Sequence, residues 1–96
     1  MLDEMKEVIM NVRCSIREAD KYARESVKHR HDHPELSTVY ARIANDKLEH
    51  VNMLHSAGKE MIEKNGDAYA KQLWTFEHEL ASDDVLQVKR MISQYK

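Results

Sequence analysis

Apolar and small side chains recur at alternating spacings of three and four residues across residues 2 to 30, and this repeat constrains the fold most. The positions are Leu2, Met5, Ile9, Val12, Ile16, Ala19, Ala23 and Ser26. Such spacing places side chains along one face of an α-helix that packs against another helix. The sequence therefore predicts one long helix over residues 2 to 30. Because the side chains shrink toward the C-terminal end of the stripe, we expect a neighbouring helix to approach closely there.

Pro34 separates this helix from a second one, because its ring disfavours helical backbone at His33 and suits the first position of a new helix. The second helix is predicted from Pro34 to Lys64 and carries two adjacent stripes. One stripe comprises Leu36, Tyr40, Ile43, Lys47, His50, Leu54, Ala57 and Met61, and the other comprises Ala41, Ala44, Leu48, Val51, His55, Gly58 and Ile62. Such a broad face favours contact with at least two other helices. Gly58 predicts a close helix approach.

The segment "KNGD" is expected to end the second helix, with Gly66 in the left-handed conformation and Asp67 as the next N-cap. A third helical stretch then shows one apolar stripe and a later one that is out of phase with it. The first consists of Tyr69, Leu73, Phe76 and Leu80, and the second of Val85, Val88, Ile92 and Tyr95. Because the phase changes near Ser82 and Asp83, either of which suits an N-cap, we expect two short helices or one kinked helix.

The composition agrees with a single all-α domain over residues 1–96. Of the 96 residues, 33% are charged and 42% hydrophobic, with two glycines and one proline, so helix breakers are few. The formal net charge of −2 offers no basic excess for nucleic acid. We find no apolar run of about 20 residues that would span a membrane and no signal peptide. Cys14 is the single cysteine, which excludes an internal disulfide and favours a reducing cytoplasm.

Three segments carry a resemblance to a known group of proteins. The stretch "IANDKLEHVNMLHSAGKEMI" is similar to the second helix of the ferritin-like, rubrerythrin-like superfamily. The stretches "IREADKYARES" and "FEHELASDDVLQVKRMISQYK" resemble the first helix and the C-terminal end of its short members, including those encoded by phages and prophages. The resemblance implies an all-α, ferritin-like antiparallel bundle of two long helices plus a shorter helical C-terminal part.

The resemblance also implies metal-site positions, which this sequence matches in part. Glu18 or Asp20 matches the carboxylate of the first helix, and His50 matches the metal-binding histidine of the second. His78 and Glu79 match a His-Glu pair of the short relatives.

Lys47 stands three residues before His50, where the superfamily has a bridging carboxylate. A protonated lysine has three donors and no acceptor, so it cannot ligate a cation. We therefore expect no di-iron site and no cofactor, with the ammonium instead paired to Glu18, Asp20 or Glu79. The alternative keeps iron or another divalent metal at one site, made of Asp46, His50 and a carboxylate from the first helix.

The remaining histidines and Trp74 have structural explanations beside functional ones. If the first helix persists, His29 and His33 are four residues apart and could take zinc or nickel. Alternatively, the exposed histidines of "HRHDHP" meet the favourable end of the helix dipole and bond free carbonyls. His55 is expected at the edge of the core, and Trp74 as an anchor for packing or a subunit contact.

The sequence as a whole favours a non-catalytic protein. Because such a short chain buries a limited share of its surface and the second helix has a broad apolar face, a homodimer is expected. We therefore expect a small phage- or prophage-derived ferritin-like protein that acts through self-association or contacts with an unidentified protein. The alternative is a ferritin-like protein that stores or oxidises iron.

Overall fold

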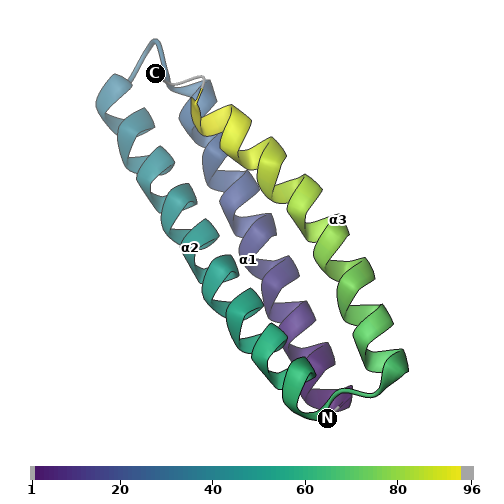
Figure 1. Ribbon diagram of the computed structural model, residues 1–96. Coiled ribbons are helices and arrows are strands. Elements are labelled where there is room, and N and C mark those ends of the chain that lie inside the picture. The colour runs from purple at the N-terminus through teal and green to yellow at the C-terminus, as the bar shows by residue number, and fades with distance from the viewer. Residues whose placement is uncertain (1, 94–96) are drawn as a thin grey trace.

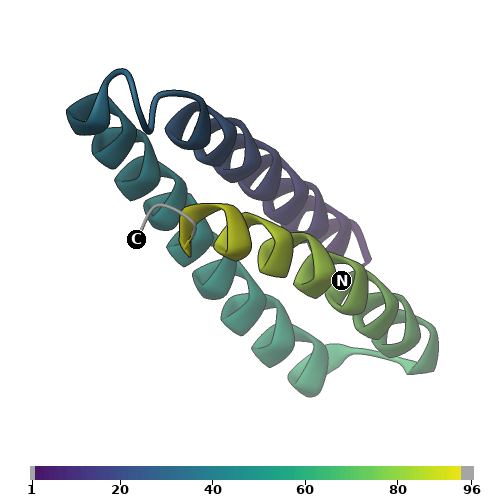
Figure 2. The same cartoon turned by 90° about the horizontal axis from the view of Figure 1, so that it is seen from above.

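The computed structural model describes residues 2–93, which form three α-helices. Helix α1 runs over Leu2–Lys28, α2 over Pro34–Asn65 and α3 over Ala68–Ser93. Figure 1 shows α2 running antiparallel to α1, and α3 antiparallel to α2. Each helix contacts both of the others, and Figure 2 shows the three as one bundle. The all-α antiparallel bundle is thus confirmed. None of the three described helices combines the length and apolar character needed to cross a membrane.

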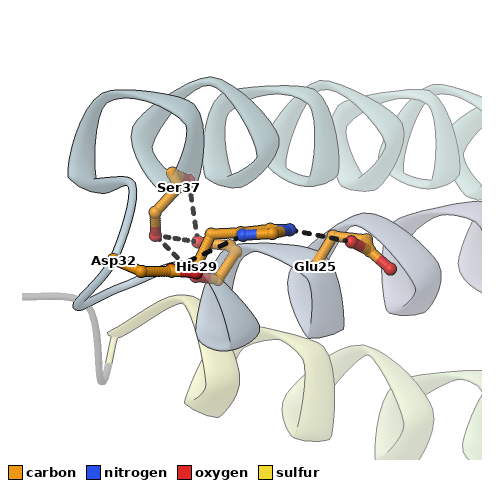
Figure 3. Close-up of polar contacts among 5 residues, drawn as sticks. Glu25, His29, Asp32 and Ser37 are labelled. Atoms are coloured by element: carbon orange, nitrogen blue, oxygen red, sulfur yellow. Dashed lines mark hydrogen bonds and ion pairs between the residues drawn. The ribbon is translucent and has the colours of Figure 1, made fainter.

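The stripe of α1 forms one side of the core, as its spacing predicts. Its members from Met5 onward are all buried: Met5, Ile9, Val12, Ile16, Ala19, Ala23 and Ser26. The side chain of Leu2 lies outside the described part of the structure. The predicted close approach also occurs, because Ser26 Oγ donates a hydrogen bond to the carbonyl of Ser37, 2.8 Å away on α2. Ser37 Oγ donates in return to the carbonyl of Ser26, and Figure 3 shows these contacts.

Helix α2 begins at Pro34, as predicted, and ends one residue beyond the predicted Lys64. His33 precedes it with non-helical backbone angles, φ −139° and ψ 72°. Helix α1 ends at Lys28, two residues earlier than predicted. Of the two predicted stripes on α2, one is buried apart from half-buried His55: Ala41, Ala44, Leu48, Val51, Gly58 and Ile62. The other is half-buried or exposed, so the face of α2 that packs is narrower than expected.

Gly58 marks a close approach between α2 and α3, as predicted. A Cβ atom added to Gly58 would overlap the ring of Trp74, with two further ring carbons at 2.6 and 2.9 Å. Trp74 is 9% exposed and packs with Met5, Ile9, Ile62 and Ala70. The indole therefore lies directly against the α2 backbone, which confirms its expected role as a packing anchor.

The third helix corrects three predictions. Residues 68–93 form one continuous helix, so the alternative of two short helices is wrong, and Ser82 Oγ donates to the carbonyl of His78 instead of capping a fourth helix. At 26 residues, α3 is nearly as long as the 27-residue α1, not a shorter C-terminal part. Gly66 is extended, with φ −78° and ψ 134°, not left-handed. Asp67 does cap α3, because its Oδ1 accepts a 2.8 Å hydrogen bond from the backbone N–H of Ala70.

The change of phase in α3 separates two faces of one helix. The buried face carries Ala70, Trp74, Ala81 and Val88, in one continuous register. The stripe that begins at Tyr69 lies on a neighbouring face and is largely exposed. Alanines at positions 70 and 81 let α3 approach the other two helices, whereas Tyr69, Phe76 and Leu80 of the first predicted stripe face outward. Tyr95, the last residue of the predicted second stripe, lies outside the described residues.

Candidate functional site

Lys47 pairs with Glu18, so the structure selects one of the three carboxylates that the sequence left open. The Nζ atom of Lys47 on α2 lies 2.8 Å from Oε2 of Glu18 on α1. Their side chains are 29% and 52% exposed. The hydrogen bond from Lys47, together with its charge, lowers the pKa of Glu18, and the same hydrogen bond raises the pKa of Lys47. The ammonium thus holds a carboxylate that the resemblance assigns to metal, at the rim of the bundle.

The other candidate ligands are spread over the three helices, although His50 lies close enough to Glu18 for its charge to help lower the pKa of that carboxyl. Asp20 accepts a 2.8 Å hydrogen bond from Nε of Arg24, one turn further along α1. Asp46 and His50 are exposed on α2, and His78 and Glu79 are exposed on α3. Across residues 2–93, the structure shows no group of three or more His, Cys, Asp or Glu side chains placed to hold a metal ion.

The turn between α1 and α2 encloses His29 in polar and aromatic contacts. Figure 3 shows its ring between two carboxylates: Nε2 is 3.5 Å from Glu25 and Nδ1 is 3.5 Å from Asp32. The ring also stacks on Tyr40, with ring centroids 6.1 Å apart. The centroid of His33 is 5.7 Å away, but α1 ends before either histidine. The zinc or nickel prediction required α1 to continue through both residues, and it does not, although the backbone N–H of His33 still donates a 2.9 Å hydrogen bond to the carbonyl of His29.

Asp32 is the acidic residue of this turn. Lost hydration acts to raise its pKa, but backbone hydrogen bonding and the nearby imidazoles of His33 and His29 outweigh this and lower the pKa. Together with Glu25, Asp32 places a carboxylate oxygen 3.5 Å from each ring nitrogen of His29. The structural explanation expected exposed histidines bonded to free carbonyls, whereas His29 is half-buried and its ring faces two carboxylates.

His55 and His78 form a contact that the sequence analysis did not foresee. The two imidazoles come from α2 and α3, and their ring centroids are 4.5 Å apart. Trp74 meets His55 edge-on, with centroids 5.9 Å apart. Burial, followed by the charge of His78, lowers the pKa of His55. His55 lies on the same stripe as Gly58, which was predicted to face another helix. The sequence therefore contained a signal that His55 also contacts that helix.

A groove of about 520 Å³ lies along the contact of α1 with α3. Ile9, Val12 and Ile16 contribute apolar lining from α1, and Leu80 contributes from α3. Arg13 at its rim binds both carboxylate oxygens of Glu77 on α3. This ion pair connects α1 to α3, and the charge of Arg13 balances that of Glu77.

The outer face of α3 exposes large apolar side chains. Tyr69 is 64% exposed, Phe76 58% and Leu80 47%, while Leu73 between them is half-buried. Spaced by four, three and four residues, these four side chains form one stripe, which we call the α3 stripe. Contiguous exposed apolar surface of this kind commonly marks a site of association.

Comparisons of this chain with models of protein families, with curated proteins and with solved structures find no match. The ferritin-like resemblance therefore rests on the residues quoted above.

Proposed function

We propose that the protein is a small ferritin-like protein without di-iron catalysis, of the kind that phages and prophages encode, and that it acts by associating with a second copy of itself. The observation that carries the association is the α3 stripe. The absence of di-iron catalysis is argued from Lys47, whose ammonium bonds to Glu18.

The composition of the α3 stripe suits an interface core. Tyrosine and phenylalanine are enriched in protein interfaces and carry much of their binding energy, while most other contacts add little. Tyr69 and Phe76 are the two most exposed members of the stripe. The acid closest to Phe76 in sequence, Glu77, already bonds to Arg13, so pairing of two such faces does not set unpaired acids against each other at the centre.

The spacing of the α3 stripe favours an antiparallel, two-fold arrangement of two α3 helices. If two α3 helices cross antiparallel beside Phe76, Leu73 of each copy faces Leu80 of the other. A closed two-fold dimer requires a self-complementary face of this kind.

The dimer is tested by measuring molar mass by light scattering and sedimentation equilibrium at micromolar concentrations. We expect the wild type to have the mass of two chains, and Phe76→Glu or Leu80→Glu to reduce it to one because each places a charge in an apolar contact. Met53→Glu is the matched control, because Met53 is an apolar residue 69% exposed on α2. It should remain dimeric.

A pair of substitutions tests the orientation. Leu80→Glu should weaken the dimer, and adding Leu73→Lys should restore part of it, because Leu73 of each copy faces Leu80 of the other. A wild-type protein that stays monomeric at these concentrations would contradict the proposed function, as would a Phe76→Glu variant that stays dimeric.

The alternative function, storage or oxidation of iron, makes a different prediction. Because Lys47 occupies the place of a bridging carboxylate, untagged protein purified without chelator should contain no stoichiometric iron. It should also not consume oxygen when ferrous ion is added. Elemental analysis and oxygen-electrode measurements check this. One or more iron atoms per chain with oxygen-dependent oxidation would favour the alternative.

A further inference from the structure

Two imidazoles from different helices meet at the seam between α2 and α3. His55 is half-buried on α2, His78 is exposed on α3, and their ring centroids lie 4.5 Å apart with planes at 53°. Trp74 lies beside both rings and fixes that side of the pair. The pair therefore consists of the partly buried ring of His55, which packs on Trp74, and the solvent-exposed ring of His78.

The ring separation agrees with that of two histidines on one metal ion. Zinc binds imidazole nitrogen at about 2.0–2.1 Å, which places two rings on one ion with centres roughly 4.5–5.2 Å apart for ligand angles of roughly 90–109°. The observed 4.5 Å matches the right-angled end of this range. Nickel and copper prefer right-angled arrangements of nitrogen ligands.

The protonation and charge of the surroundings also permit a metal ion. Because burial and His78 lower the pKa of His55, its imidazole is neutral near pH 7, the form that ligates metals. Basic and acidic side chains both line the cleft on this side: Lys59 lies 4.0 Å from Glu63 on α2, and α3 contributes Lys71 and Glu79. On the α1 side, Arg13 is bonded to Glu77. The nearby basic groups are thus balanced by acids.

We propose that His55 and His78 form a two-histidine site for a nickel, zinc or copper ion that clamps α2 to α3, with water completing the coordination. The site uses one residue that the ferritin-like resemblance names, His78, and one that it does not, His55. It is independent of the proposed dimer, and either can fail without the other. An ion held by both helices binds the folded chain, so it stabilises that state by mass action.

Thermal unfolding of the untagged full-length chain tests the site. We expect the melting temperature to rise progressively with added Ni²⁺ or Zn²⁺ and not with Mg²⁺, which prefers oxygen ligands. The shift should be lost in His55→Ala and in His78→Ala. His33→Ala is the matched control, because it breaks the other histidine pair, whose ring centroids are 5.7 Å apart. It should keep the shift.

A second measurement on the wild type does not depend on how the variants fold. Substoichiometric Ni²⁺ should broaden the imidazole NMR signals of His55 and His78 before those of His29, His31 and His33. The proposal is overturned if neither ion raises the wild-type melting temperature. It is equally overturned if both alanine variants keep the shift, or if broadening begins at the histidines of the α1–α2 turn.

Discussion

Lys47 and His55 on α2 each contact a partner that a different helix supplies. The charge of Lys47 on a packing stripe predicted a carboxylate partner, because a charged group at a buried edge requires one. The identity of that partner, Glu18, depends on how far α1 is shifted along α2. The apolar pattern of the sequence does not determine that shift. His55 was placed correctly at the core edge, but its neighbour His78 lies 23 positions further along and depended on the packing of α3.

Gly58 offers the sharpest prediction at this scale. In Gly58→Ala the new methyl would overlap the Trp74 ring, so one helix must shift. Overpacking of this kind costs about 1–3 kcal/mol, partly offset by about 1 kcal/mol from the better helix propensity of alanine. We expect a lower free energy of unfolding in urea denaturation.

A neighbouring position and a double variant serve as controls for Gly58. Ala57 is exposed, so Ala57→Gly reports the propensity effect alone in the same turn. In a Trp74→Leu background, where the clash is absent, Gly58→Ala should cost less stability than it does in the wild type. A Gly58→Ala variant more stable than wild type would show that the indole does not rest on the α2 backbone.

At the scale of elements, the apolar pattern predicts the bounds and buried faces of α1 and α2 better than those of α3. Pro34 and the α1 stripe act locally, so the start of α2 and the buried face of α1 followed from the sequence. Helix α3 carries two apolar faces, and its buried face uses small alanines around Trp74. A prediction based on the large apolar side chains therefore takes the outer face of α3 for the buried one. It also takes the change of face near residue 82 for the end of a helix.

The seam between α2 and α3 makes a prediction about pH. Because the pKa of His55 is lowered in the folded state, the unfolded chain binds its proton first as pH falls. The stability that neutral His55 permits is complete above the unfolded pKa of about 6.5 and is lost progressively below it. The loss for this one proton has a slope of at most about 1.4 kcal/mol per pH unit.

Urea denaturation between about pH 7 and pH 5 measures this slope. His55→Gln should flatten it, whereas His31→Gln, in the exposed turn, should leave it unchanged. Glu18 and Asp32 also have lowered pKa values, but their contributions are lost only below their ordinary values of 4.5 and 3.8, so they do not enter this range. Equal slopes for wild type and His55→Gln would contradict the assignment.

At the scale of the whole molecule, three groups of buried side chains follow one another along the bundle. Met5 and Trp74 belong to the group at one end, Val51 to the middle one and Leu48 to the third. The helical class followed from composition and periodicity, since breakers are few and no strand pattern occurs. The length of α3 did not, because it depends on which of its faces meets the core.

The elongation of the bundle affects how its association must be measured. Its Cα trace extends 51 × 17 × 16 Å, with a radius of gyration of 15.3 Å, whereas a compact domain of this length has roughly 12.5 Å. A rod experiences more friction than a sphere of equal mass, so a monomer would elute early and imitate a larger particle. Side-by-side pairing through α3 would double the mass, broaden the rod and lower its frictional ratio. End-to-end pairing would also double the mass, but it would raise the frictional ratio. Sedimentation velocity therefore reports where two copies meet as well as how many there are.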